Sequence, residues 1–334
     1  MSEIYDCIIV GAGIAGLTAS LYLARQGLKI IIIGKDLGGQ LKLASDIQNY
    51  PGFTSINGMD LIRRIEKQVR NYNVNIMYDE VIKIEEIYRD GKKLFKLRTV
   101  KECEYETLSV ILALGKSPKE LNVPGEREFK GRGISYCVIC DAPLFRNKNV
   151  ALISWGEHAE LSVTTLLNYV SKLYWIYPTE HADTDDEFTR KIRENSKVEI
   201  YSSTEVVKFL GEKKLSKIIL MNRKTGRCFE LQVDGVFIEV GYELKTDFLK
   251  DFIELNHNGE IIIDKLCRTS REGIFAAGDV TDTPYKQAII AAAQGAIAAL
   301  SACNYIYSVK GIGKKITRDW RKLQLQESYF RISI

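Results

Sequence analysis

The chain has 334 residues, of which 46% are hydrophobic and 27% are charged. This length suffices for about two domains with well-buried cores. A formal net charge of +4 without a long run of Lys or Arg argues against a nucleic-acid-binding protein. Residues 7–10 suit a first β-strand rather than a signal peptide. The longest apolar tract, 288–303, is shorter than the roughly 20 residues of a membrane span, so we expect a soluble, cytoplasmic protein.

The first predicted elements are a strand, a glycine-rich turn, a helix to about residue 26 and a second strand at 28–33. The turn, Gly11-Ala12-Gly13-Ile14-Ala15-Gly16, has the G-x-G-x-x-G spacing of a dinucleotide-binding βαβ unit. Gly11 makes the tight turn, Gly13 lets the backbone approach a pyrophosphate, and Gly16 lets the helix pack on the strand. The helix N-terminus then faces the anion. The alternative is a structural glycine turn in an ordinary α/β domain.

The same order of elements recurs in residues 150–176 with the same spacing as in 7–33. Each unit continues into β-rich sequence with a hairpin turn, at 89–92 in the first and 223–226 in the second. The chain then returns with a strand at 270–279, which ends in Gly278-Asp279, and a helix at 286–303. A carboxylate at the end of a parallel strand lies where ligands bind in such folds; the alternative is a turn aspartate that caps a helix.

The pattern predicts an α/β fold class with two Rossmann-like, three-layer domains, the second inserted in the first. We expect the first domain at 1–115 and 245–309 and the second at 116–244, with a C-terminal extension at 310–334.

Seven cysteines, an odd number, do not form the pattern of a secreted disulfide framework. Five are isolated and are predicted to be small core residues: Cys7, Cys103, Cys228, Cys267 and Cys303. Cys137 and Cys140 form a C-x-x-C pair, in which two thiols can close a small disulfide. Asp141, beside the second thiol, can deliver or accept a proton. A zinc site would need two more ligands, so we expect no metal; purely structural thiols remain the alternative.

Several segments, in this order, resemble the low-molecular-weight thioredoxin reductases, which are flavoprotein disulfide reductases with two dinucleotide-binding folds. They are VGAGIAGLTASLYLAR (10–25), GGQL (38–41), QNYPGF (48–53), ILALGKSPKELNVPGE (111–126), GISYCVICDAPLF (133–145), GIFAAGDV (273–280) and KQAIIAAAQGAIAA (286–299). The resemblance implies FAD in the first domain, a redox disulfide between Cys137 and Cys140, and Cys140 nearest the flavin.

The resemblance also implies the FAD-binding residues. Asp279 would contact the ribityl chain, and Asp36 lies close to where an acid binds the adenosine ribose. The family's usual Ala-Thr-Gly is Ala113-Leu114-Gly115 here, which removes a hydroxyl beside the flavin. The implied set is Gly11, Gly13, Ala15, Gly16, Asp36, Gly39, Gln40, Leu41, Asn49, Val81, Ala113, Gly115, Gly278, Asp279, Lys286, Gln287 and Ala288.

The family's second domain carries a G-x-G-x-x-A/G turn for NADPH, and this turn departs from it. Ser154 replaces the first glycine, Gly156 and Ala159 fit the pattern, and Trp155 and Glu157 fill the intervening places. An indole at this turn would have to rotate away before a pyrophosphate could approach.

Residues 178–187, at the place of the family's arginine cluster for the 2′-phosphate, hold five acids and no Lys or Arg. A carboxylate about 4 Å from the phosphate would repel it by roughly 1–4 kcal/mol per unit charge. We expect NADPH not to bind usefully; the alternative is a divergent site with lower affinity, or NADH use through other contacts.

The C-terminal extension, 310–334, carries Trp320, Tyr329 and Phe330 among basic residues. Some relatives place a C-terminal aromatic over the flavin, and a similar lid is one hypothesis. A partly disordered or dimer-packing basic tail is the other.

The resemblance implies a homodimeric enzyme that passes electrons from reduced flavin to the Cys137–Cys140 disulfide and on to a thioredoxin- or glutaredoxin-like protein. Segments near 116–118 and 241–244 are candidate hinges. Without NADPH, ferredoxin is a candidate donor by resemblance to NADPH-independent relatives; a small reductant, or a reversed, oxidising direction, are others. Two alternatives are an NAD(P)H-dependent thioredoxin reductase with an altered cofactor site and a non-catalytic, redox-sensing flavoprotein.

Overall fold

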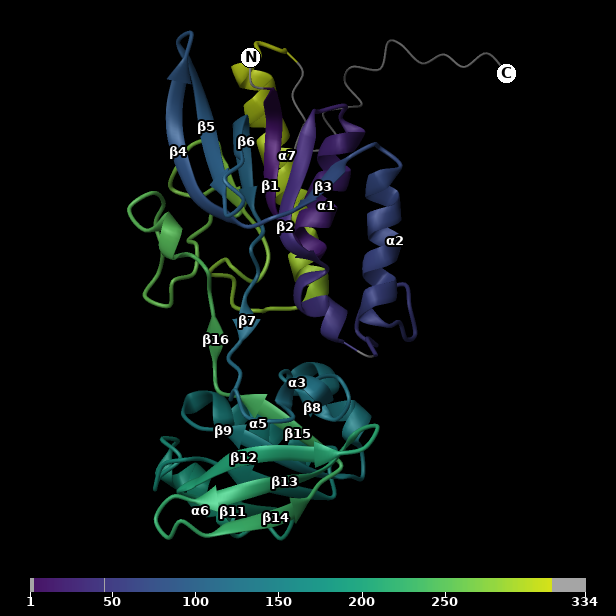
Figure 1. Ribbon diagram of the computed structural model, residues 1–334, viewed down its shortest axis with the longest axis vertical. Helices are drawn as coiled ribbons and strands as arrows, with labels where there is room; N and C mark the ends of the chain where they lie inside the picture. Colours follow the sequence, from purple (N-terminus) through teal and green to yellow (C-terminus); the bar gives the residue numbers. More distant parts are fainter. Residues whose placement is uncertain (1–2, 45, 314–334) are drawn as a thin grey trace, which may run out of the picture. The chain divides into compact units, whose positions relative to one another are not determined.

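The computed structural model describes residues 3–44 and 46–313, with all side chains in these ranges except those of Leu43, Glu157 and His158 (Figure 1). The described residues form two compact units. Within the described residues, the first unit draws on 3–42, 58–116 and 244–313, and the second on 43–44, 46–57 and 117–243. The predicted α/β class, with the second Rossmann-like unit inserted in the first, is confirmed. Residues 43–57, which we expected in the first domain, group with the second unit.

The first unit contains a seven-stranded sheet in the order β3-β2-β1-β6-β5-β4, with β17 also paired to β6. Parallel pairs join β1 (Ile4–Ala12), β2 (Ile30–Leu37), β3 (Asn75–Tyr78), β6 (Glu104–Leu112) and β17 (Ile274–Ala276). Antiparallel pairs join β4 (Val81–Arg89) and β5 (Lys92–Thr99) to each other and β5 to β6. Strands β1, β2, β6 and β17 are largely buried, as expected for a sheet covered on both faces, whereas the edge strand β3 is mostly exposed.

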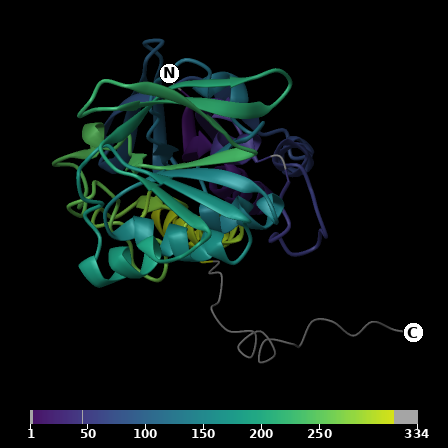
Figure 2. The same ribbon diagram turned by 90° about the horizontal axis from the view of Figure 1, so that it is seen from below.

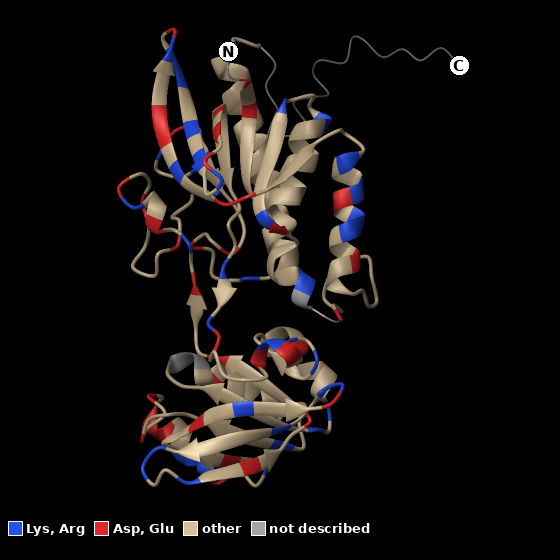
Figure 3. Cartoon of the chain, in the orientation of Figure 1, with Lys and Arg blue, Asp and Glu red and all other residues tan. Residues whose placement is uncertain are grey.

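Three helices accompany this sheet: α1 (Ile14–Arg25), α2 (Gly58–Arg70) and α7 (Ala288–Val309). Basic and acidic side chains follow the length of α2 (Figure 3), while Leu61, Ile62 and Val69 are buried. The helix is therefore amphipathic, with one side exposed. Short 3-10 turns lie at η1 (Gly39–Leu43), η2 (Ala142–Phe145) and η3 (Asp247–Leu249).

Helix α7 packs against α1 at a contact that only small residues permit. A Cβ atom added to Gly295 would lie 2.2 Å from the Ala15 carbonyl oxygen. The helix is 22 residues long, and by length and composition it could cross a membrane. Our argument that this tract is too short is thus wrong, because the helix continues past Cys303 to Val309. Its buried small residues instead explain its composition: Ala291, Ala292, Gly295, Ala298, Ala299 and Ala302.

The second unit contains a five-stranded parallel sheet in the order β11-β10-β9-β15-β8. These strands are β8 (Ile134–Ser135), β9 (Asn149–Ser154), β10 (Lys172–Ile176), β11 (Val198–Tyr201) and β15 (Gly235–Glu239). An antiparallel sheet of β12 (Thr204–Gly211), β13 (Leu215–Asn222) and β14 (Cys228–Gln232) covers one face. Helices α5 (Glu157–Leu167) and α6 (Asp186–Arg193) cover the other, and α3 (Glu126–Phe129) and α4 (Val138–Asp141) are single turns (Figure 2).

The two units repeat one topology. The order β3-β2-β1-β6 of the first corresponds to β11-β10-β9-β15 of the second. Both predicted hairpins are present, between β4 and β5 and between β13 and β14. The isolated cysteines differ from the prediction, because Cys103 and Cys228 are exposed and only Cys7, Cys267 and Cys303 are buried.

The two segments that we expected to act as hinges meet in a small antiparallel sheet. Strand β7 (Ser117–Pro118) pairs with β16 (Tyr242–Glu243), with Pro118 opposite Tyr242. The chain thus enters and leaves the second unit at adjacent positions.

We predict that Gly295→Ala destabilises the protein by about 1–3 kcal/mol, because the added methyl group meets backbone that cannot move independently. Helix propensity alone predicts a gain of about 0.5–1 kcal/mol, so the two effects differ in sign. Urea unfolding followed by circular dichroism measures the difference, with the exposed Ala293→Ser as control. A higher unfolding midpoint for Gly295→Ala would contradict the packing of α7 on α1.

Candidate functional site

The turn between β1 and α1 leaves a helix N-terminus open to a ligand. Gly11 has φ 114°, and a Cβ there would lie 2.1 Å from the Ala113 carbonyl oxygen. By contrast, a Cβ on Gly13 would meet nothing within 4 Å. Gly13 caps α1 without any side-chain hydrogen bond. Open backbone at the end of a 12-residue helix suits a pyrophosphate.

Other predicted FAD-binding residues converge on this turn from distant parts of the first unit. A Cβ on Gly39 would lie 3.7 Å from the Gly13 Cα, and one on Gly278 would lie 3.0 Å from the Ala15 Cβ. The Gln40 amide donates to the Lys116 carbonyl at 2.6 Å and to Asp279 at 3.4 Å. The carboxyl ends of β1, β6 and β17 thus meet segment 38–41 at one edge of the sheet.

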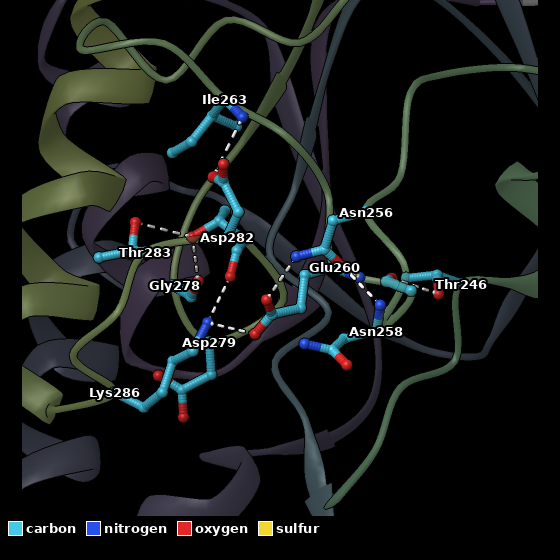
Figure 4. Close-up of polar contacts among 12 residues, drawn as sticks. Thr246, Asn256, Asn258, Glu260, Ile263, Gly278, Asp279, Asp282, Thr283 and Lys286 are labelled. Carbon is cyan, nitrogen blue, oxygen red and sulfur yellow. Dashed lines mark hydrogen bonds and ion pairs between the residues drawn. The ribbon is translucent and has the colours of Figure 1, made fainter.

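Asp279 is a partly buried carboxyl of this site. Burial raises the pKa of its carboxyl above the ordinary value, while Lys116 and Lys286 oppose that rise. Lys286 also forms an ion pair with Glu260 at 2.8 Å and donates to the Thr281 carbonyl (Figure 4). Lys286 is therefore held in place by Glu260 and the Thr281 carbonyl.

Gln294 is a residue of this site that the sequence analysis missed. Its amide is buried on α7, and its Oε1 accepts the Gly278 N–H at 2.8 Å. Its nitrogen donates to Thr283. The sequence did contain a signal for it, namely a glutamine on the face of the helix that consists of small residues. A polar side chain on a buried helix face needs hydrogen-bond partners.

Binding of FAD by all of these residues stays a prediction, and the remaining predicted residues lie as follows. Asp36 pairs with Lys42, and Val81 is buried in the core of the sheet. Gly115 has φ 64°, Leu41 lies in η1, and Gln287 precedes Ala288 at the start of α7. Asn49 lies in the segment that groups with the second unit.

The C-x-x-C pair forms a disulfide in the second unit, between Cys137 and Cys140. Cys137 precedes α4, and its Sγ accepts the Cys140 N–H at 3.2 Å. Ser135 accepts the Cys137 N–H at 3.1 Å and donates to the Asp141 carboxyl at 2.6 Å. The sequence analysis missed Ser135, although this serine stands only two residues before Cys137 in the sequence.

Asp141 lies next to this disulfide in a partly buried position. Burial raises the pKa of its carboxyl above the ordinary value, and the hydrogen bond from Ser135 opposes this rise. Such a carboxyl keeps a proton to higher pH than an exposed aspartate. It is therefore suited to exchange a proton with a neighbouring thiol.

Glu239, at the carboxyl end of β15, also contacts this region and was missed. Its Oε1 accepts the Val138 N–H at 2.9 Å, and its Oε2 accepts the Ser162 hydroxyl. Its backbone carbonyl accepts the Ser154 hydroxyl at 3.0 Å. Strand β15 pairs with β9, so Glu239 lies opposite Ser154 at the sheet edge.

The second glycine turn follows β9 and is tied to the rest of its own unit. The Gly156 N–H donates to the Ala182 carbonyl at 2.7 Å, and the Trp175 indole donates to the Ser154 carbonyl at 2.9 Å. Trp155 is partly buried and packs against the cores on both faces of the sheet. Gly156 has φ 77° and a Cβ there would meet nothing within 4 Å. The Glu157 side chain lies outside the described part of the chain.

Acidic residues after β10 have structural partners. The Asp185 side chain caps α6 by accepting the Phe188 N–H at 2.9 Å. Glu180 pairs with Lys224 at 2.7 Å, and Arg223 donates to the Pro178 carbonyl at 3.4 Å. The fold thus brings two basic residues of the β13–β14 hairpin to segment 178–187, which has none of its own. Sequence spacing gave no sign of this contact.

The aromatic residues of the C-terminal extension, Trp320, Tyr329 and Phe330, lie outside the described residues, as does the lid hypothesis that rests on them.

Two Rossmann-like units, one with an open glycine turn and the other with a C-x-x-C disulfide, define a class: the disulfide oxidoreductases that use nucleotide cofactors. A model of the pyridine nucleotide-disulphide oxidoreductases matches residues 5–295. The chain belongs to this family of enzymes, and its relatives within it include low-molecular-weight thioredoxin reductases. The family uses flavin and nucleotide cofactors.

Comparisons with individual proteins agree with this family assignment. The thioredoxin reductase of Treponema pallidum (strain Nichols) is 38% identical over 310 residues, which cover 92% of this chain and 98% of that protein. The solved thioredoxin reductase of Streptococcus pyogenes MGAS5005 is 33% identical, with a TM-score of 0.86, and the match covers 92% of this chain and 100% of that chain. The NADH dehydrogenase of Bacillus subtilis (strain 168) is 33% identical, over 91% of this chain but 59% of that protein.

We predict that Asp141→Asn raises the unfolding midpoint at neutral pH. The folded protein raises the pKa of this carboxyl, mainly through burial, so the folded state favours its protonated form. In the wild type, the contribution of Asp141 to the free energy of unfolding is fully present below the ordinary aspartate pKa of about 4. This contribution is lost as the pH rises through the raised pKa of the folded state. The gain from the substitution should therefore disappear at acidic pH.

Urea unfolding at a series of pH values measures this effect, with the exposed Asp183→Asn as control for loss of one carboxylate. A gain of the same size at every pH would contradict a raised pKa for Asp141.

Proposed function

We propose that this enzyme is an FAD-dependent dithiol/disulfide oxidoreductase that reduces a thioredoxin- or glutaredoxin-like protein through Cys137 and Cys140. The observation that carries the proposal is the Cys137–Cys140 disulfide beside a carboxyl, Asp141, whose pKa is raised. Kinship with thioredoxin reductases over 92% of the chain supports the substrate class.

The described residues of the first unit fit FAD. Gly11, Gly13 and the start of α1 would hold the pyrophosphate, because the backbone there is open and the helix has no side-chain cap. Asp279 and Gln40 would contact the ribityl region, as the family resemblance implies. Bound there and reduced by an electron donor, the flavin would supply two electrons to the disulfide.

The reaction of the second unit balances in electrons and protons. Two electrons and two protons open the Cys137–Cys140 bond and give a dithiol. One thiolate then attacks the partner's disulfide, forms a mixed disulfide and releases a partner thiol. The second cysteine then attacks the enzyme sulfur of the mixed disulfide, which restores the Cys137–Cys140 bond and releases the other partner sulfur as a second thiol. Asp141 holds the proton that passes to or from the adjacent thiol.

We further propose that NADPH is a poor donor. Trp155 packs into both cores at the turn, and the Gly156 N–H already has the Ala182 carbonyl as partner. Lys224 could attract a phosphate, but it pairs with Glu180. Reduced ferredoxin or a small reductant would then supply electrons, or flux would run in the oxidising direction. A homodimer in the cytoplasm is the expected state of such an enzyme.

Two alternative functions are each compatible with one observation. The left-handed Gly156, with open space at its Cβ position, favours a nucleotide site that still takes NADPH or NADH. A redox sensor that does not turn over would carry the same disulfide.

We expect Cys140→Ser to abolish reduction of thioredoxin when the yellow holoprotein is reduced by dithionite or ferredoxin. The variant cannot form the intramolecular disulfide, so electrons stop at the flavin. The exposed Cys103→Ser, which lies outside the pair, should reduce thioredoxin at the wild-type rate. If the wild type reduced only one equivalent of thioredoxin and did not turn over repeatedly, the result would favour a redox sensor and contradict an enzyme.

We also expect micromolar NADPH or NADH, added without oxygen, to leave the flavin absorption band unchanged. The acidic segment repels phosphate, and the packed indole and the occupied Gly156 N–H leave a pyrophosphate few contacts. Reduced ferredoxin should bleach the band under the same conditions. Bleaching by micromolar NADPH would show that the second nucleotide site works.

A further inference from the structure

The redox pair has a second acidic neighbour besides Asp141. Glu239 lies on β15, and its carboxylate accepts the Val138 N–H at 2.9 Å, across 101 positions of sequence. That N–H belongs to the peptide bond that joins Cys137 to Val138. The other carboxylate oxygen accepts the Ser162 hydroxyl of α5. Both partners are donors, which is what an ionised carboxylate needs.

The main chain also holds Glu239 in place. Its carbonyl accepts the Ser154 hydroxyl at 3.0 Å, and Ser154 is completely buried. The parallel pairing of β15 with β9 places the two residues opposite each other. Because this contact and the carboxylate's hydrogen bonds restrict both ends of the residue, the charge stays at a constant position relative to Cys137.

The N–H of Val138, next to Cys137 in the chain, donates to the Glu239 carboxylate. Backbone N–H groups near a thiolate stabilise it and make the disulfide easier to reduce. In this structure the Cys137 Sγ has the Cys140 N–H at 3.2 Å, whereas the Val138 N–H is taken by Glu239. The glutamate therefore places a carboxylate on the peptide bond next to Cys137.

We propose that Glu239 is a positioning residue that keeps the reduction potential of the Cys137–Cys140 disulfide low, by placing a fixed carboxylate beside Cys137. The inference rests on the proposed function, in which this disulfide cycles. The reduced form carries negative charge when a thiol ionises, and a like charge nearby raises its free energy. The pair thereby becomes a stronger donor to a protein disulfide.

The other titratable groups near the pair act differently. Asp141 follows Cys140, and burial, then Asp46, raise the pKa of its carboxyl. Asp141 is thus the group suited to carry a proton. Tyr136 donates its hydroxyl to Glu126 of α3 at 2.8 Å, and burial followed by this bond raises its pKa, so it stays neutral. Glu239 is bound directly to the Cys137–Val138 peptide by its carboxylate.

Glu239→Gln in the full-length holoprotein removes the charge but keeps an oxygen that can accept the Val138 N–H. We expect the disulfide of this variant to be about tenfold easier to reduce in equilibrium with dithiothreitol, which corresponds to a potential about 30 mV higher. Thiols are counted by alkylation after acid quenching. The pH midpoint for iodoacetamide alkylation of the reduced protein should fall. Glu212→Gln, an exposed glutamate in the β12–β13 turn, should match the wild type in both measurements.

Glu239→Ala separates charge from hydrogen bonding. If Ala and Gln raise the potential by similar amounts, the charge acts as proposed. If Gln matches the wild type and only Ala differs, Glu239 has a purely structural role and the inference is overturned. The proposed function fails separately, when the wild-type disulfide is not opened by reduced flavin or does not pass electrons to thioredoxin.

Discussion

The chemistry of both units depends on one property of parallel sheets, which is that the carboxyl ends of neighbouring strands meet at a single edge. In the first unit this edge gathers Gly11 near the end of β1, Lys116 after β6 and Asp279 after β17, although these residues are far apart in the chain. In the second it gathers Ser154 at the end of β9, Cys137 after β8 and Glu239 at the end of β15. Backbone pairing therefore determines which side chains can cooperate.

The repeated topology shows that a fold can persist while the contacts of its turn change. In the first copy, Gly13 faces open space at the start of α1. In the second, the corresponding N–H of Gly156 meets a carbonyl from the same unit, and a tryptophan joins the turn to both cores. The strand and helix need only apolar faces and small residues, whereas a phosphate needs unpaired donors. Unpaired donors at a turn are therefore more easily lost than the strand and helix around it.

The fold and the glycine turn could be predicted because their signals are local. Gly11, Gly13 and Gly16 have a fixed spacing next to an apolar strand, and Cys137 and Cys140 lie three residues apart. Contacts between distant segments left no such signal. Glu239 reaches Val138 only through the pairing of β15 with its neighbours, and Lys224 reaches Glu180 through a hairpin. The predicted helix ended with the alanine-rich tract at Cys303, whereas α7 continues to Val309, because no Pro or Gly intervenes and Ile306 and Tyr307 are still buried.

The pairing of β7 with β16 also bears on how such a protein can be assembled and altered. Since Pro118 and Tyr242 are partners in one ladder, the two ends of the inserted unit are neighbours. A segment with adjacent ends can be exchanged for another of similar end spacing without stretching its host, which is the usual condition for domain insertion. The host chain could then acquire a different electron-accepting module while the residues of its own cofactor site stay where they are.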